Sequence, residues 1–416
     1  MEVTEKMRYR AALSLAFSPS APVRTLDLFS GRGIELDRIT DAVLQRGKHA
    51  AIYGERGVGK TSLANVLPDK LGFLAKFNYK VVRHNCSTIS SFGSMWEGVF
   101  RELSFKRLMG NLDETTASAI PINRFLPPEP GPEDVRLLLQ ESGTPNIIIF
   151  DEFDRAPKDC ETSGLLADTI KSLSDHAVDT TLIIIGVADS IDELISEHKS
   201  IERALVQIKM PRMSESELLS ILESGFKHAD MQIDINARWQ IAAFAQGLPH
   251  NVHELGLFTG YAALNSGRLN ADMSDVDPAI KQATENAQQT IVVSYSQATS
   301  SPHQNIFKEI LLAAALARKN DLGYFSAGDL RNPLAAIMQK NYGIDAYMRH
   351  LNSFCEEARG RLLEKKGEKR RYLFRFSEPI LEPYVIMRGV AEGLIPRDKV
   401  LEIQSSNLKA NPLSLF

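Results

Sequence analysis

Eight consecutive residues have the types and spacing of a loop that binds phosphate. They read Gly54-Glu55-Arg56-Gly57-Val58-Gly59-Lys60-Thr61 and fit the pattern G-x-x-x-x-G-K-[ST]. Glycines let successive backbone N–H groups converge on an anion without a Cβ in the way. We expect Lys60 to neutralise the β- and γ-phosphates of a nucleotide, and Thr61 to hold Mg²⁺ through its hydroxyl.

The residues on either side of this loop support the same interpretation. Ala50–Tyr53 form a short apolar run typical of a strand, and Ser62–Leu67 are typical of a helix whose positive end points at the anion. Ser62 therefore belongs to the predicted site. The alternative is a glycine-rich turn that arose by chance, which the strand–loop–helix context makes the weaker interpretation.

A second motif, 147–152, places two carboxylates after a strongly apolar run. Ile147–Phe150 predict a strand buried on both faces, as in a parallel sheet, and Asp151 and Glu152 follow at its carboxyl end. Ligands bind at that edge of open α/β sheets. Asp151 suits the shell of Mg²⁺, and Glu152 suits polarisation of an attacking water. An acidic strand end that caps the next helix is the alternative.

Composition limits the classes of protein that fit. The 416 residues predict two or three domains, and 44% hydrophobic and 24% charged residues are typical of a soluble globular protein. A net charge of −4 excludes a molecule that is basic throughout, so any nucleic-acid contact needs a local basic surface. Cys86, Cys160 and Cys355 lack metal-ligand spacing and indicate core thiols in a reducing compartment.

The N-terminus only loosely imitates a signal peptide. Met7–Arg10 are basic and Ala11–Phe17 mildly apolar, but Glu2 and Glu5 stand where positive charge is needed. We expect an amphipathic segment or a mobile tail here, no membrane span, and a cytoplasmic protein.

Strand and helix patterns alternate from Leu26 to about Pro211 and then give way to helices. Further strands are predicted at 80–85 and 181–186, with helices at 34–45, 94–108, 133–140 and 164–177. Prolines between 110 and 132 predict a loop or insertion. Helices are then predicted at 214–229, 236–245, 252–265, 277–291, 305–318, 326–330 and 344–357, followed by short strands at 361–363 and 372–376.

Together these motifs resemble the AAA+ ATPases of the initiator-like (Orc/Cdc6-type) clade and related bacterial ATPases, over roughly residues 26–380. The loop at Gly54–Thr61 and the pair Asp151–Glu152 correspond to the Walker A and Walker B motifs of P-loop NTPases. The resemblance implies an α/β P-loop core with a parallel sheet and helices on both faces, an all-helical lid and a C-terminal winged-helix-like domain. It divides the chain into 1–25 (tail), 26–212 (nucleotide-binding domain), 213–295 (lid), 296–400 (winged-helix-like domain) and 401–416 (tail).

The resemblance also implies roles for weaker motifs of the core. Gly31-Arg32, within Ser30-Gly31-Arg32, resembles the motif that lies near the adenine, although a plain turn before a helix is equally compatible. Asp189 stands where the family has its polar sensor 1 residue, more commonly Asn. It could equally be the N-cap of a helix at Ile191–Glu197.

Two further positions would link the site to a neighbouring subunit and to the lid. Arg203 falls where the family has an arginine finger, which completes the site of a neighbouring subunit; an ion pair with Glu202 or Glu197 is the alternative. Pro249-His250 resembles the sensor 2 turn, with His in place of Arg. That departure suggests a slow, switch-like ATPase, or a histidine with no role in chemistry.

Basic residues of the last predicted hairpin could grip the phosphates of duplex DNA. They are Lys365, Lys366, Lys369, Arg370 and Arg371. The alternative is a solvated turn with no binding role, because most runs of charged residues simply face solvent.

Three functional classes remain open. The first is a Mg²⁺-dependent ATPase that couples ATP binding and hydrolysis to self-association and to a partner or duplex DNA, with ATP between core and lid. The second is a nucleotide-gated signalling or scaffold protein that recruits an effector protein without binding nucleic acid, favoured by the acidic net charge and the missing sensor 2 Arg. The third, a small-molecule kinase, has no need of Glu152 or of the trailing domains.

Overall fold

The structure is a computed structural model that describes residues 3–74, 79–105, 120–157, 160–195, 201–301, 305–368 and 371–409. The chain divides into two units. The first, here the sheet unit, comprises Val23–Glu55 and Gly59–Met210. The second, here the helical unit, comprises Met1–Pro22, Arg56–Val58 and Pro211–Phe416.

A five-stranded parallel sheet forms the centre of the sheet unit. Its strands are β1 (His49–Gly54), β2 (Lys80–Asn85), β5 (Asn146–Asp151), β6 (Thr180–Val187) and β7 (Leu205–Lys209). They pair in the order β2-β5-β6-β1-β7, every neighbour parallel. The predicted α/β fold is confirmed, and the carboxyl ends of β1 and β5 meet at one edge of the sheet.

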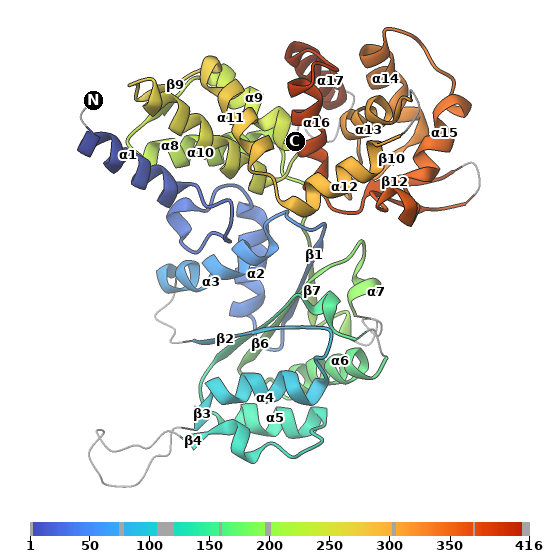
Figure 1. Cartoon of the computed structure of the whole chain (residues 1–416). Helices are drawn as coiled ribbons and strands as arrows, with labels where there is room; N and C mark the ends of the chain where they lie inside the picture. Colours follow the sequence, from blue (N-terminus) through green and yellow to red (C-terminus); the bar gives the residue numbers. More distant parts are fainter. Residues whose placement is uncertain are drawn as a thin grey trace. The chain divides into compact units, whose positions relative to one another are not determined.

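Helices cover both faces of this sheet. Figure 1 shows α2 and α3 on one side and α4 and α5 on the other. The helices of the unit are α2 (Gly33–Leu44), α3 (Lys60–Leu74), α4 (Phe92–Glu102), α5 (Pro132–Glu141), α6 (Cys160–Asp175) and α7 (Ile191–Leu194). Ile148 and Phe150 of β5 join a buried cluster with Trp96 of α4, whereas Ile147 and Ile149 fill the opposite face. Successive side chains of a strand point to opposite faces of the sheet. Because every residue from Ile147 to Phe150 is apolar, the strand is buried on both faces.

Short elements connect these helices and strands. They are the 3₁₀ turns η1 (Leu26–Leu28), η3 (Ile122–Phe125) and η4 (Phe153–Arg155), and the paired strands β3 (Ser104–Phe105) and β4 (Ile120–Pro121). The predicted loop at 110–132 lies largely outside the described residues, and its end forms β4, η3 and the start of α5. Helix α4 ends at Glu102, before the predicted boundary at 108.

The first part of the helical unit is a bundle. Its helices are α1 (Val3–Ala16), α8 (Glu215–His228), α9 (Ile235–Ala245), α10 (Pro249–Asn265), α11 (Met273–Glu285) and α12 (Gln289–Thr299). The predicted single helix at 277–291 is wrong, because α11 ends and α12 begins within that range. The lid was predicted to be all-helical. Its described residues also contain a pair of two-residue strands, β8 (Gln232–Ile233) and β9 (Asn270–Ala271).

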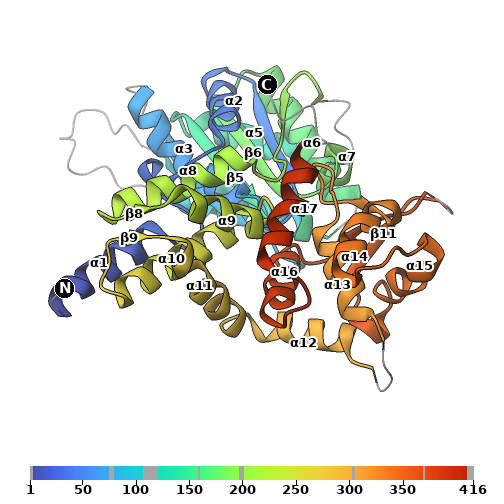
Figure 2. The ribbon, with the colours of Figure 1, turned by 90° about the horizontal axis from the view of Figure 1, so that it is seen from above.

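The N-terminal residues, expected to form a tail, begin with helix α1, which lies beside α10 (Figure 2). Leu13 and Phe17 are buried at 0% and 1% exposure. A Cβ at Gly225 or Gly256 would fall 2.3 or 2.7 Å from the Phe17 ring, so these glycines admit that ring between α8 and α10. No helix of the described residues, α1 included, is long and apolar enough to cross a membrane.

The second part of the helical unit combines helices with a small sheet. The elements are α13 (Phe307–Leu316), β10 (Phe325–Ser326), η6 (Ala327–Leu330), α14 (Arg331–Met338), α15 (Ile344–Ser353), η7 (Glu357–Arg359), β11 (Leu363–Lys366), β12 (Leu373–Phe376), α16 (Leu381–Ala391) and α17 (Arg397–Lys409). The strands pair in the order β10-β12-β11, all antiparallel. A helical domain that contains a β-hairpin agrees with the predicted winged-helix-like fold. Helix α17 runs into the range 401–416 that was expected to be a tail.

A buried charge cluster joins the two parts of the helical unit. Glu382 of α16 is 0% exposed and accepts Arg212 at 2.8 Å and Lys319 at 2.9 Å. Arg212 also donates to the carbonyl of Gln246, at 3.1 Å, just before α10. Two cations around one buried carboxylate satisfy a charge that would otherwise be very unfavourable there.

His49 sits at the first position of β1 with 0% exposure. Its Nδ1 accepts the backbone N–H of Leu182 at 3.0 Å, so the imidazole completes the junction of β1 with β6 in its neutral form. Burial lowers the pKa of His49 from 6.5 to about 3.

We expect acid to destabilise the protein through His49. Its pKa in the folded state is below its unfolded value of 6.5, so the unfolded chain binds the proton first and stability falls as pH drops from 6.5 towards 3. Between pH 7 and pH 5 this amounts to about 2 kcal/mol. The variant His49→Gln keeps an acceptor for the Leu182 N–H but does not titrate. Its free energy of unfolding should therefore fall by about 2 kcal/mol less than that of the parent between pH 7 and pH 5. Urea unfolding followed by the fluorescence of buried Trp96 measures this.

The matched control is His176→Gln, an exposed histidine of the same unit. It should keep the pH dependence of the parent. If His49→Gln keeps that dependence too, His49 is not its source.

Candidate nucleotide-binding site

The predicted phosphate loop connects β1 directly to α3. Gly57 and Gly59 have φ values of 85° and 97°, which glycine adopts without strain. At Gly54 a Cβ would fall 2.2 Å from the carbonyl oxygen of Met210, so the close approach of these backbones requires glycine. Helix α3 begins at Lys60, and its first N–H groups face the loop that precedes it.

Lys60 is held by the loop itself. Its Nζ donates to the carbonyls of Gly54, at 3.0 Å, and Glu55, at 2.8 Å, and the side chain is buried. Glu55 and Val58 are also buried, whereas Arg56 is exposed and forms an ion pair with Glu378 at 3.3 Å. The ammonium is therefore fixed within the loop, as a phosphate-neutralising charge must be.

Thr61 and Ser62 have different partners. The Thr61 hydroxyl donates to Oδ2 of Asp151 at 3.0 Å, which joins the phosphate loop to the end of β5. The Ser62 hydroxyl accepts the backbone N–H of Val23 at 3.1 Å, and Asn65 donates to the Val23 carbonyl at 3.2 Å. The structure thus brings Thr61 and Asp151 together as the sequence motifs predict.

The Asp151 carboxylate is 5% exposed and accepts donors at both oxygens. Oδ1 accepts the backbone N–H of Glu152 at 2.8 Å. Oδ2 accepts Thr61 and also the guanidinium of Arg83, which extends from β2 and donates to Asn65 as well. Both oxygens of this carboxylate are therefore fixed in orientation.

Acidic side chains at this edge of the sheet act on a neighbouring buried thiol. Burial, with the charges of Asp151, Asp154 and Glu152, raises the pKa of the Cys86 thiol to about 12. A hydroxyl beside a carboxylate is the donor set that Mg²⁺ takes with nucleotide. Among the described residues no group of three or more His, Cys, Asp or Glu could hold a metal alone, so a cation here would take its other ligands from phosphate and water.

Glu152 adopts an unusual backbone conformation. Its φ is 54°, in the left-handed region that a residue with a Cβ seldom occupies. The side chain is about half exposed and accepts Arg155 at 2.7 Å. A local cost in backbone energy immediately after Asp151 is typical of functional sites and agrees with a role for this carboxylate.

Gly31 and Arg32 also have positive φ, 73° and 59°, and they lead into α2. Arg32 is 2% exposed and forms an ion pair with Glu35 at 3.2 Å. They form the turn before helix α2, as the alternative interpretation predicted.

Asp189 follows the carboxyl end of β6, as predicted for sensor 1. Its backbone N–H donates to Glu193 at 2.8 Å. The N-cap of α7 is Ser190, so the alternative role of Asp189 as N-cap is wrong. The predicted helix at Ile191–Glu197 is described only to Leu194, and 196–200 lie outside the described residues.

Arg203 is strongly exposed, at 86% of its side chain, and forms an ion pair with Asp175 at 3.1 Å. Neither alternative partner predicted from sequence is involved in that contact, and Glu197 lies outside the described residues. Because exposed ion pairs contribute little stability, this contact holds the Arg203 guanidinium only weakly.

His250, which the resemblance placed at sensor 2, is largely buried beside the N-terminal segment. Pro249 starts α10, and Nδ1 of His250 lies 2.7 Å from the Pro19 carbonyl, to which it must donate because a carbonyl only accepts. Burial lowers the pKa of His250, partly opposed by this bond to Pro19. His250 is therefore uncharged at pH 7 and does not supply the fixed charge that an arginine would.

The basic residues predicted to bind DNA lie on and after β11. Lys365 and Lys366 are exposed, and Lys365 lies 4.5 Å from the centre of the Tyr372 ring. Arg371 is exposed beyond the turn, whereas Lys369 and Arg370 lie outside the described residues. The described part of the hairpin thus presents its basic side chains to solvent, which both interpretations allow.

Arg83 and Asn65 are the site residues that the sequence did not single out. Arg83 follows Val81 and Val82 in the interior of the predicted strand at 80–85. A charge inside such a strand needs a partner, and this was the available signal.

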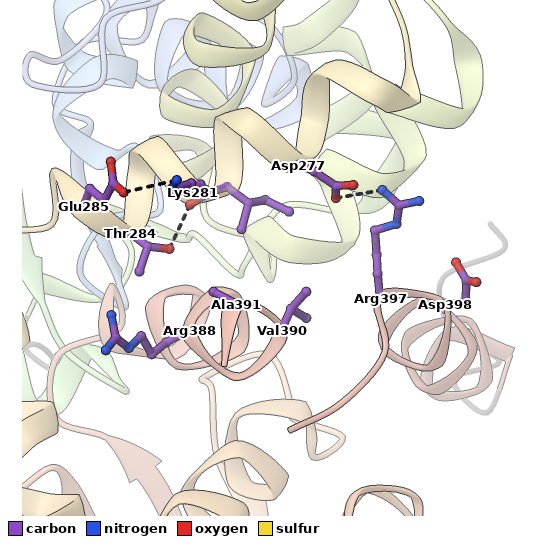
Figure 3. A pocket seen from close by; sticks show the side chains of 10 residues that line it. Asp277, Lys281, Thr284, Glu285, Arg388, Val390, Ala391, Arg397 and Asp398 are labelled. Carbon is purple, nitrogen blue, oxygen red and sulfur yellow. Dashed lines mark hydrogen bonds and ion pairs between the residues drawn. The ribbon is translucent and has the colours of Figure 1, made fainter. Parts of the chain in front are cut away.

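A cavity of about 600 Å³ lies elsewhere, in the helical unit, between α11, α16 and α17 (Figure 3). Its walls combine apolar Ile280 and Val390 with ion pairs, among them Arg397 to Asp277 at 2.7 Å. None of its lining residues belongs to the predicted site. Its charged groups are balanced, and it lacks a glycine-rich loop for phosphate.

Comparisons with known proteins agree with this geometry. Residues 50–212 match the model of the ATPase family associated with various cellular activities (AAA). No curated protein sequence matches the chain.

Solved structures resemble the chain at low sequence identity. The ORC2 protein of Aeropyrum pernix, in ADPNP and ADP complexes, is 16% identical with a TM-score of 0.51, covering 95% of this chain and 98% of that one. The ORC1 protein of the same organism, in complex with DNA, is 15% identical with a TM-score of 0.47, covering 92% and 97%. A Walker-type ATPase of Pyrococcus abyssi is 15% identical with a TM-score of 0.47, covering 88% and 98%.

The family match and the likeness to ORC2 together confirm the family resemblance and the fold class predicted from the motifs. Residues 50–212 thus resemble an AAA ATPase domain, and the chain shares the fold of an Orc-type protein.

Proposed function

We propose that the protein binds ATP with Mg²⁺ at the loop Gly54–Thr61, hydrolyses it slowly, and couples this cycle to self-association and to engagement of duplex DNA or another partner. The observation that carries the proposal is the contact of Thr61 with Asp151 beside the buried Lys60. It unites the phosphate loop and the acidic strand end in one place.

Each residue has a stated task in this proposal. Backbone N–H groups of the loop and Lys60 bind the phosphates, and Thr61 with Asp151 would hold Mg²⁺, which neutralises charge on the β- and γ-phosphates. Glu152 orients the attacking water and accepts its proton. Arg203 of a neighbouring subunit neutralises charge in the transition state, and Asp189 contacts the γ-phosphate or the water.

Slow turnover follows from the sensor 2 position. His250 is neutral and donates to Pro19, so it adds no fixed charge when the γ-phosphate leaves. The affinity for a partner would then differ between the ATP-bound state and the state that has lost the γ-phosphate, as in other nucleotide switches.

A second candidate is a nucleotide-gated scaffold that recruits an effector protein and binds no nucleic acid. The neutral His250 and the net charge of −4 favour it over a motor on DNA. It uses the same nucleotide site and differs only in the partner.

Lys60→Ala should abolish ATP binding, because the loop loses its only lysine. Glu152→Gln should bind ATP with near-parental affinity and lose turnover by roughly 10²- to 10⁴-fold, the scale of general base catalysis. Calorimetric titration and phosphate release measure the two effects. Glu97→Gln is the matched control, since Glu97 is also an exposed acid paired with an arginine of its own segment, and it should behave as the parent. Parental turnover in Glu152→Gln would refute the base assignment.

Arg203→Ala should spare nucleotide binding and lower hydrolysis, because it removes a charge supplied to the neighbouring site. Mixed with Lys60→Ala, which cannot bind ATP but keeps Arg203, it should regain part of its activity. Phosphate release at several mixing ratios measures this. No recovery at any ratio would contradict an arginine that acts between subunits.

Reversal of Lys365, Lys366, Lys369, Arg370 and Arg371 to Glu should abolish binding to duplex DNA if the hairpin grips phosphates. The parent should show a salt dependence with a slope of about −0.9 per phosphate contacted. Fluorescence anisotropy of labelled duplex DNA across salt concentrations tests this.

The control reverses Lys340 and Lys399, which are exposed lysines of the same unit; Lys340 also lies over a tyrosine ring. It should bind as the parent does. Parental binding by the hairpin variant would exclude this surface, and no binding by the parent would favour the scaffold.

A further inference from the structure

Arg83 places a permanent positive charge beside Asp151, a predicted metal ligand. It lies on β2, which pairs in parallel with β5 so that Arg83 is opposite Ile149 and Asn85 is opposite Asp151. Its guanidinium donates through one nitrogen to Asp151 and through the other to Asn65. An arginine in a protein does not lose its proton, so this charge is present at every physiological pH.

The ion pair uses the same oxygen that Thr61 uses. Oδ2 of Asp151 accepts both Thr61, at 3.0 Å, and Arg83, while Oδ1 accepts the backbone of Glu152. A carboxylate offers about four lone pairs, and three are engaged here. Because Thr61 and Asp151 would hold Mg²⁺, Arg83 donates to a carboxylate that the ion would also require.

We propose that Arg83 is a positioning residue that competes with hydrated Mg²⁺ for Asp151 and thereby sets how strongly nucleotide binding depends on Mg²⁺. The inference rests on the proposed function, since it concerns the same site.

Two electrostatic effects act in the same direction. A guanidinium beside Thr61 repels a divalent cation at that hydroxyl and weakens binding of the metal–nucleotide complex. The same guanidinium attracts the phosphates of nucleotide alone and strengthens binding without metal. Arg83 thus brings the two affinities closer together, and removal of its charge should separate them.

The quantity to measure is the ratio of two dissociation constants for a fluorescent ATP analogue, one in EDTA and one in excess Mg²⁺. In Arg83→Met this ratio should rise about tenfold over the parent, the scale of one charge-assisted hydrogen bond. Arg83→Lys keeps a charge and should return the ratio towards the parental value, which a purely structural role would not require. A ratio in Arg83→Met within twofold of the parent would overturn the proposal.

Controls separate this outcome from a loss of fold or of the site. Arg83→Gln removes the charge but keeps a polar group. If circular dichroism shows that Arg83→Met does not fold, the ratio measured for Arg83→Gln tests the proposal instead. Arg46→Met removes an exposed arginine of the same unit that pairs with Asp179, and its ratio should equal that of the parent. If the parent binds no nucleotide under either condition, the proposed function itself fails; if it binds and the ratio is unchanged in both charge-removing variants, only the role of Arg83 fails.

Discussion

One carboxylate organises the site. Asp151 stands at the end of a strand buried on both faces, and its two oxygens accept a hydroxyl from the phosphate loop, a backbone N–H and a guanidinium from β2. These contacts join three segments that are far apart in the sequence. Because the strands are parallel, their carboxyl ends meet at one edge, and the order β2-β5-β6-β1-β7 gives these segments that common edge. The function proposed for the chain depends on this meeting point.

The features predicted most reliably were those in which local chemistry decides the structure. The phosphate loop needs glycine at Gly54, Gly57 and Gly59 because the backbone there has positive φ, and that requirement is visible in the sequence. Strand β5 was predicted because uninterrupted apolar residues fit a sheet covered on both sides. The contact of Thr61 with Asp151 followed from the motifs that contain them.

Features that depend on distant partners could not be predicted. Strand β7 was missed because polar and apolar residues mix in Leu205–Lys209, as they do at the edge of a sheet. Residues 1–25 were expected to form an amphipathic segment or a mobile tail because their own pattern is weak. Helix α1 is anchored by Phe17, which fits beside glycines of α8 and α10 more than two hundred residues away. The partners of Arg83 and His250 could not be predicted either, since the residues next to them in the sequence do not identify Asp151 or Pro19 as contacts.

A crystal structure with a non-hydrolysable ATP analogue and Mg²⁺ tests the central claim most directly. The account predicts the triphosphate within the loop Gly54–Thr61, Mg²⁺ at the hydroxyl of Thr61, and Asp151 facing the water of that ion. A nucleotide bound elsewhere, or a metal that contacts neither Thr61 nor the water shell of Asp151, would contradict it.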